Sequence, residues 1–328
     1  MIVPSPHPKG YVCLRAEGAP VFDGRLDKPF WANAPWTDAF VDIEGDAKPA
    51  PRFRTRAKML WDDSYFYIGA ELEEPHVWGT LAEHDSVIFQ DNDFEVFIDP
   101  DGDNHRYYEI EINALGTEWD LLLARPYRDG GPAINSWEIP GLRTAVHVDG
   151  TLNDPSDEDK GWSVEIALPW KVLAECAGRP SPPKDADQWR VNFSRVQWRH
   201  TVMGGKYGKV LGLKEDNWVW SPQGAIDMHR PEKWGYVQFS TQTSSAPAFQ
   251  QDRAWPALDA LHRVYHAQHA FRGKHGRWAK HVQDLGIELE GFDVMIETTS
   301  YLFEATVAVP GGGTRSIRQD SLITKGAP

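Results

Sequence analysis

Residues 92–99 decide the fold class, because they read Asn-Asp-Phe-Glu-Val-Phe-Ile-Asp and place apolar residues at every second position. Successive side chains of a β-strand point to opposite faces of a sheet, so this stretch predicts a strand with one apolar face and one largely polar face. The same alternation recurs in residues 65–72, 107–114, 162–168 and 189–194. Short alternating runs broken by Gly, Pro, Asn and Asp are typical of antiparallel sheets packed face to face. The sequence therefore predicts a mainly β sandwich.

The alternating runs occupy the middle of the chain, and the two ends have a different character. Several prolines near the N-terminus fix the backbone and remove hydrogen-bond donors, which favours an irregular arm. After the last run, the small and polar sequence Thr-Gln-Thr-Ser-Ser-Ala-Pro is typical of a linker. The predicted division is an arm (1–20), a β-sandwich (21–240), a linker (241–251) and a small α+β tail (252–328).

The tail combines helical and extended patterns. Apolar residues at helical spacing predict a helix over about residues 252–285, which Gly273 and Gly276 are expected to interrupt. A final hairpin is predicted, with residues 295–308 as one strand and residues 315–323 as its partner. No catalytic motif is visible in the tail, and any protein partner that it has is unassigned.

Composition excludes several classes of protein. Hydrophobic residues at 41% and charged residues at 25% are ordinary globular values, which argue against disorder. The 48 acidic residues against 34 basic ones give a net charge of −14, which disfavours nucleic-acid binding because phosphate contacts need a basic surface. No run of about 18 apolar residues occurs, so no membrane span is expected. The 15 tryptophans are unusual, since aromatic rings stack on sugars and also fill sandwich cores.

The cellular compartment stays open at the level of sequence. Cys13 and Cys176 are the only cysteines, and they either form one disulfide or remain two buried thiols. Residues 1–8 lack the charged, apolar and small-residue regions of a signal peptide. The protein is therefore either cytoplasmic or numbered from a residue that follows a removed signal.

The polar faces of the predicted strands hold the most informative candidates for chemistry. Glu95, Glu111, Asn113 and Asn192 all point away from the apolar side of their strands. Carboxylates accept hydrogen bonds from hydroxyl groups, and amides both donate and accept, which suits a polyhydroxylated sugar. An ordinary solvated sheet face is the alternative. If the protein is an enzyme, Glu95 with Asp93 or Glu111 would be the acid and base of a glycoside hydrolase.

Two other patterns bear on metal binding. Asp99, Asp101 and Asp103 lie in an oxygen-rich turn and are candidate calcium ligands, although such turns often only satisfy backbone donors. Three histidines lie at helical spacing in the tail: His262, His266 and His269. This spacing can ligate zinc, but no acid or cysteine completes the set of ligands. We therefore expect these histidine side chains to face solvent. No glycine-rich phosphate loop or nucleophile elbow occurs, so no nucleotide cofactor is predicted.

Six motifs in order resemble a known family. They are residues 22–27 with Trp31, then 60–68, 92–99, 161–167, 189–193 and 231–235. In this order and spacing they resemble carbohydrate-binding module family 9, an immunoglobulin-like β-sandwich related to the DOMON cytochrome-like domains. The resemblance covers about residues 20–240 and leaves the tail outside.

The resemblance implies a ligand and a set of contact residues. Members of the family bind the reducing ends of plant polysaccharides and small sugars, clamp the sugar between two tryptophans, and carry structural calcium. By position, Glu95 matches the family's strand acid, Asn113 matches its strand amide, and Asn192 lies on a strand that supplies another polar contact.

The chain departs from the family at several positions. Phe89 stands where the first tryptophan belongs, Met228 and His229 stand where the second belongs, and Glu111 replaces a strand arginine. Trp119, Trp218 and Trp220 could rebuild an aromatic platform or lie in the core. Arg195 breaks the alternation of its strand, which places it at a bulge or a strand end, where a long donor can reach a ligand.

The leading hypothesis is a non-catalytic carbohydrate-binding protein of carbohydrate catabolism, with a site formed by Glu95, Glu111, Asn113, Asn192, Arg195, Phe89, Trp218, Trp220 and His229. Family habit implies an extracellular or periplasmic location. A glycoside hydrolase is the first alternative. A haem b electron carrier is the second and is disfavoured; Met228 with His84 or His229 would be its axial ligands.

Overall fold

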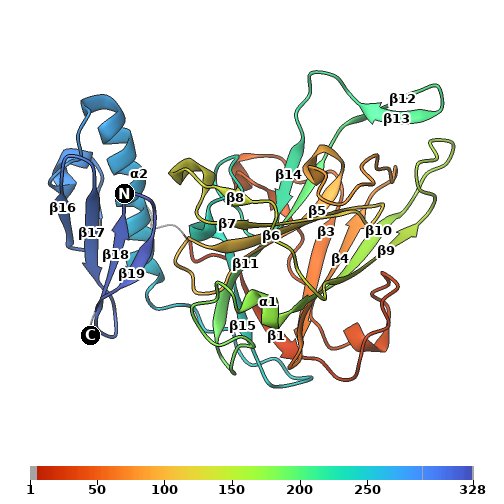
Figure 1. Ribbon diagram of the computed structural model, residues 1–328, viewed down its shortest axis with the longest axis horizontal. Coiled ribbons are helices and arrows are strands. Elements are labelled where there is room, and N and C mark those ends of the chain that lie inside the picture. The colour runs from red at the N-terminus through yellow and green to blue at the C-terminus, as the bar shows by residue number, and fades with distance from the viewer. Residues whose placement is uncertain (1–5, 290, 327–328) are drawn as a thin grey trace.

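The computed structural model describes residues 6–289 and 291–326, which form a β-sandwich followed by a smaller helix-and-sheet tail (Figure 1). One half of the sandwich contains the strands β5 (Asp93–Asp99), β6 (Tyr107–Asn113), β7 (Glu118–Leu123), β8 (Ala133–Ile134), β11 (Gln188–Gln197), β14 (Asp216–Val219), β15 (Gly235–Phe239) and the short β2 (Val41–Asp42). The other half contains β3 (Thr55–Trp61), β4 (Tyr65–Glu73), β9 (Arg143–Asp149) and β10 (Gly161–Pro169). The mainly β fold class is confirmed.

Strand β1 (Gly10–Arg15) joins the two halves, because it pairs in parallel with β15 on one side and with β3 on the other. The strand order along the path is β8-β7-β6-β5-β11-β15-β1-β3-β4-β10-β9. The prediction of an irregular arm over residues 1–20 is therefore wrong for Gly10–Arg15. This segment is buried on both faces, so its sequence shows no alternation that would reveal a strand.

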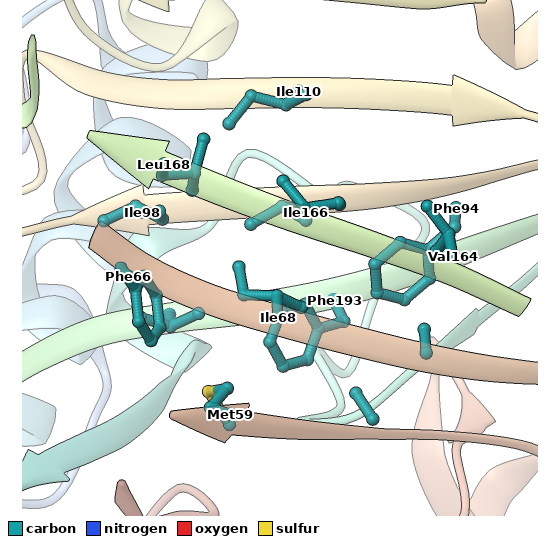
Figure 2. Close-up of a cluster of buried hydrophobic side chains, with 14 of the residues drawn as sticks. Met59, Phe66, Ile68, Phe94, Ile98, Ile110, Val164, Ile166, Leu168 and Phe193 are labelled. Carbon is teal, nitrogen blue, oxygen red and sulfur yellow. The ribbon is translucent and has the colours of Figure 1, made fainter. Parts of the chain in front are cut away.

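The core lies between the two halves of the sandwich and is filled by the apolar faces that alternation predicted. Figure 2 shows side chains of both halves meeting there, among them Phe94 and Ile110 from one half and Ile68 and Ile166 from the other. All four are fully buried. Because the odd-numbered acids of β5 alternate with these core residues, they must point to the opposite face of that half.

The tail packs the helix α2 (Trp255–His275) against a four-stranded meander of β16 (Val294–Thr298), β17 (Phe303–Ala308), β18 (Thr314–Arg318) and β19 (Ile323–Lys325). The single strand predicted over residues 295–308 is in fact two strands joined by a turn. Gly273 lies inside the helix instead of interrupting it. Gly276 ends the helix in a left-handed conformation (φ 67°), where its N–H donates to the Arg272 carbonyl.

The tail docks on the sandwich through polar contacts. The Asn104 amide donates to the Ser321 carbonyl at 2.8 Å, and Lys233 pairs with Asp259 at 3.2 Å. The expectation of solvent-facing histidines is wrong for His262, which is buried and lies 2.9 Å from the Asn104 amide nitrogen. His266 is half-buried and contacts Glu232 of the sandwich at 3.2 Å, whereas His269 is exposed as expected. The apolar stripe is therefore not the only buried part of the helix.

Remaining short elements connect the larger ones without changing this architecture. The helix α1 (Trp170–Leu173) follows β10, and β12 (His200–Met203) and β13 (Lys206–Lys209) form a projecting hairpin (Figure 1). Cys13 and Cys176 are both free thiols, Cys13 being buried in the core. None of the helices in residues 6–289 and 291–326 has the length and apolar character needed to cross a membrane.

Candidate functional site

The outer face of β5, β6, β7 and β11 carries a row of side chains in register. Glu95 on β5 pairs with Glu111 on β6 and with Ser194 on β11, and Glu111 pairs with Trp119 on β7. Directly opposed residues on neighbouring strands have Cβ atoms about 4.5–5.5 Å apart, so these side chains stand beside one another. The alternation that sends Phe94 into the core therefore brings two glutamates and an aromatic ring together on the other face.

This row forms the floor of a cavity of about 160 Å³. Its lining contains four glutamates (Glu95, Glu109, Glu111 and Glu215) and four aromatic residues (Phe89, Phe97, Trp119 and Tyr127), completed by Val196, Asn217, Met228 and His229. The rings of Phe89 and Trp119 are stacked, with centroids 6.5 Å apart and an angle of 28° between their planes. The cavity thus combines carboxylates with flat apolar surfaces.

The acids of this site are buried without a compensating positive charge. Burial is the main cause that raises the pKa of Glu95 to about 7. Burial and then repulsion from Glu95 raise the pKa values of Asp93, Glu109 and Glu111 well above their ordinary range. Burial and then the neighbouring Arg128 lower the pKa of His229 to about 3, so its ring is neutral near pH 7. No lysine or arginine of the described residues lines the cavity.

Few hydrogen bonds satisfy these carboxylates. Glu111 accepts one from the Phe89 backbone N–H at 2.7 Å, and Asp93 accepts one from the Val196 backbone N–H at 3.2 Å. Oδ2 of Asp93 and Oε2 of Glu95 are buried and have no partner among the described residues. A buried acceptor without a partner is costly, which makes Oε2 of Glu95, whose side chain lines the cavity, a candidate for ligand contact. Carboxylate oxygens of Asp93, Glu95 and Glu111 lie within 4.8 Å of one another.

The structure brings Phe89, Glu95, Glu111 and His229 together in the cavity, but not the two predicted amides. Asn113 donates to the Leu81 carbonyl at 2.8 Å and accepts from the Thr117 N–H at 3.0 Å. Asn192 donates to the Ser221 carbonyl and accepts from the Ser221 N–H, both at 2.9 Å. Both amides hold local backbone in place, so the structure assigns them no ligand contact.

Arg195, Trp218 and Trp220 also lie away from the cavity. Arg195 lies near the end of β11 and continues the alternation of the core residues, so its side chain is on the core side of the strand. There it pairs with buried Glu74 at 3.0 Å. Its guanidinium lies over the Trp218 ring, 5.2 Å from the centroid. Trp218 and Trp220 are both buried in the sandwich core. These three residues stabilise the fold.

Sequence reasoning missed part of the lining. Glu109 has the same phase as Glu111 on β6, so alternation was a usable signal for it. Tyr127 and Glu215 come from segments outside the long strands, where no periodic pattern predicts the direction of a side chain. His84, the other haem-ligand candidate, lies within 4.0 Å of Asp120 and Glu138 instead of beside Met228.

The predicted calcium ligands form a compact group in the loop between β5 and β6. Ligand oxygens of Asp99, Asp101 and Asp103 lie within 4.8 Å of one another. Asp99 accepts from the N–H groups of Gly102 and Asn104, both at 2.9 Å. Oδ1 of Asp101 is buried and has no partner among the described residues. A set of hard oxygen donors with one unpartnered atom fits the chemistry of Ca²⁺.

A larger cavity of about 590 Å³ lies on the outer face of the other half of the sandwich. It contains Trp36 and several basic residues, but its charges are largely paired, since Arg54 and Arg56 both contact Glu71 at 3.0–3.1 Å. Size alone does not identify a binding site. The smaller cavity has buried acids without a cationic partner and an unsatisfied oxygen, Oε2 of Glu95, so we assign the candidate site there.

The fold and site together define a mainly antiparallel β-sandwich with a candidate ligand cavity on the outer face of one half. Residues 22–184 match the family model for carbohydrate family 9 binding domain-like proteins, so the chain carries a domain of this family. The β-sandwich continues beyond the matched segment to β15, and the tail lies outside the match.

Curated relatives share the same part of the chain. The chain is 26% identical over 158 residues to exoglucanase XynX of Acetivibrio thermocellus and 24% identical over 161 residues to endo-1,4-β-xylanase A of Thermoanaerobacterium saccharolyticum. These matches cover 48% and 49% of this chain, and the chain spans only 12% of the length of either relative.

Solved structures show a similar fold. A crystal structure from Bacteroides uniformis has a TM-score of 0.52 and 16% identity, and the match covers 71% of this chain and all of that one. A family 9 carbohydrate-binding module from Caldicellulosiruptor kristjanssonii in complex with cellotriose has a TM-score of 0.47 and 15% identity, over 73% of this chain and 99% of that one. At these identities the first likeness concerns the fold alone.

Proposed function

We propose that the protein binds carbohydrate without hydrolysing it, and that the sugar occupies the cavity lined by Glu95, Glu111 and Trp119. The observation that carries this proposal is the juxtaposition of buried carboxyl groups, one of them with an unsatisfied oxygen (Oε2 of Glu95), with aromatic rings in a single cavity. Sugar hydroxyls donate to carboxylates, and the C–H face of a pyranose packs on aromatic rings. The family match over residues 22–184 supports the same ligand class.

The size of the cavity supports binding of a terminal or single sugar ring. Its volume of about 160 Å³ is below the roughly 300–1,000 Å³ typical of sites for drug-sized ligands. The relatives are named as a xylanase and an exoglucanase, which favours plant-type polysaccharide ends or small sugars as ligands. We propose that the protein is located outside the cytoplasm, in the extracellular space or the periplasm, because plant polysaccharides are found outside the cytoplasm.

Geometry also favours binding over turnover. A glycoside hydrolase needs two carboxyl groups on either side of the bond between two sugar units. Carboxylate oxygens of the candidate acids Asp93, Glu95 and Glu111 instead cluster within 4.8 Å of one another, and only Glu95 and Glu111 line the cavity, which is sized for one ring. We therefore expect no release of reducing sugar from xylan, cellulose or their oligosaccharides.

Glu95→Ala is expected to weaken sugar binding by roughly 10- to 150-fold, because a hydrogen bond to a charged group contributes about 1.5–3 kcal/mol. The fold should persist, since Glu95 makes no ion pair whose partner would be left buried and alone. Isothermal titration calorimetry with the sugar that the wild type binds best measures the effect. Glu297→Ala, which removes an exposed acid on β16, is the matched control and should bind as the wild type does. Unchanged affinity in Glu95→Ala would remove Glu95 from the site.

We also propose that Asp99, Asp101 and Asp103 bind a structural calcium ion that stiffens the loop between β5 and β6. A ligand that binds only the folded state stabilises it by about 2.7 kcal/mol at a hundredfold excess over its Kd, so millimolar Ca²⁺ should raise the Tm by several degrees. Asp101→Ala should abolish this increase. An identical Tm in Ca²⁺ and in EDTA for the wild type would contradict the proposal.

A further inference from the structure

We propose that the cavity binds a cationic amino sugar, a pyranose that carries a protonated amine, in preference to a neutral sugar. This inference rests on the proposed function and adds the charge of the ligand to it. It follows from the acidic groups that line the cavity, from the unsatisfied oxygen of Glu95 in its floor, and from the aromatic walls.

The ionisable groups that line the cavity are all acidic or neutral near pH 7. Glu95, Glu109, Glu111 and Glu215 line the cavity, and no lysine or arginine of residues 6–289 and 291–326 does. The ammonium of Lys209 interacts electrostatically with Asp93 and Glu215, but it lies over the Trp198 ring, 3.5 Å from its centroid, outside the lining. Buried charges are costly unless they are paired. In the empty cavity, burial and repulsion from neighbouring acids raise the pKa values of Glu95, Glu109 and Glu111 and so disfavour their ionised forms. An ammonium group would stabilise the ionised carboxylates by pairing with them, whereas a neutral sugar would not.

The acids at the cavity include carboxylate oxygens that lack a hydrogen-bond partner among the described residues. Glu95 is 4% exposed, lines the cavity, and has an Oε2 atom without a partner. Oδ2 of Asp93 is likewise buried and unpartnered. An ammonium group offers three donors, and hydrogen bonds between two charged groups are about twice as strong as neutral ones. The amine of the ligand is therefore expected to contact Glu95 and its neighbour Glu111.

The walls distinguish an organic cation from a metal ion. Ca²⁺ takes six to eight oxygen ligands at about 2.3–2.6 Å. Here aromatic rings and Met228 form much of the wall and supply no such ligand. The cavity of about 160 Å³ is also several times the ~30 Å³ that one water molecule occupies, so a bare ion would leave most of it unfilled. A sugar ring fills this space, and the Trp119 face attracts a nearby cation.

Calorimetric titration of the full chain with glucosamine, glucose and N-acetylglucosamine tests the inference, and CaCl₂ alone is the metal control. Glucose has a hydroxyl where glucosamine has its amine, and N-acetylglucosamine has an uncharged amide there. We expect glucosamine to bind at least tenfold more tightly than either. In Glu95→Gln, which keeps the shape and an acceptor but removes the charge, we expect the glucosamine affinity to fall about tenfold and the glucose affinity to change less than threefold.

The outcomes separate this inference from the proposed function. Equal or tighter binding of glucose would overturn the preference for a cation and leave carbohydrate binding intact. Binding of Ca²⁺ that Glu95→Gln abolishes, without binding of glucosamine, would overturn it in favour of a metal site. If none of these three sugars binds, the inference fails, and the proposed function is then decided by titration with cellobiose and xylobiose.

Discussion

Replacing Glu232 with alanine is expected to lower the free energy of unfolding by about 3–5 kcal/mol, because it breaks a buried ion-pair network. Glu232 is 2% exposed and contacts Arg128 at 2.9 Å, Arg230 at 3.2 Å and His266 at 3.2 Å. His266 belongs to α2, so this carboxylate joins the tail to the sandwich. Without it, Arg128 would remain largely buried beside fewer negative charges.

The pH dependence of this contribution follows from the pKa of Glu232. Burial alone would raise that pKa, but the Arg128 charge and the other basic neighbours hold it well below 4.5. A group whose folded-state pKa is depressed stabilises the protein above its unfolded pKa and loses that contribution as the pH falls. Urea unfolding of wild type, Glu232→Ala and the exposed control Glu297→Ala at pH 7 and pH 3 measures both effects. A loss below 1 kcal/mol at pH 7 would show that the network does not stabilise the docked tail.

Glu95→Gln is expected to have the opposite effect and to raise the free energy of unfolding at pH 8 by roughly 3 kcal/mol. The pKa of Glu95 is raised from 4.5 to about 7 in the folded protein. Because one pKa unit corresponds to about 1.4 kcal/mol, ionisation of Glu95 costs the folded state roughly 3 kcal/mol more than it costs the unfolded state. A group whose folded-state pKa is raised contributes stability below its unfolded pKa, and that contribution is lost as the pH rises through the folded pKa. The wild type should therefore lose stability between about pH 4.5 and pH 7–8 through Glu95.

Unfolding of both proteins in urea across pH 4.5–8 measures this difference. The two curves should nearly coincide at pH 4.5, where Glu95 is protonated in the folded state and about half protonated in the unfolded state, and diverge as the pH rises. A variant that is less stable than the wild type at pH 8 would contradict the description of Glu95 as a buried, uncompensated acid. If the prediction holds, the site is maintained at a cost in stability, as is common for functional sites.

Alternation predicted the sandwich because most of its strands have one buried face. The three core residues Phe94, Val96 and Ile98 occupy every second position of β5, and the same pattern identified β4, β6, β10 and β11. Strand β1 was missed for the opposite reason, since Tyr11 and Leu14 belong to two different clusters on its two faces. A strand that is buried on both faces has no period-two pattern.

The site was only partly predictable. The pairing of Glu95 with Glu111 follows from strand phase, but phase does not tell a ligand-binding amide from one that fixes a turn, as Asn113 does. The alternative of an ordinary solvated face is wrong for these strands, because the segments that carry Phe89 and Tyr127 help to enclose the cavity above them. Such loop contributions depend on tertiary packing, and no local pattern encodes them.

The most direct test of carbohydrate binding is a calorimetric titration of the wild-type chain with glucose, cellobiose, xylobiose, glucosamine and a uronic-acid disaccharide, followed by an assay of each mixture for released sugar. We expect saturable binding of at least one sugar with millimolar or tighter Kd, competition between sugars for one site, and no turnover. Absence of binding to every member of the panel, or release of reducing sugar, would contradict it.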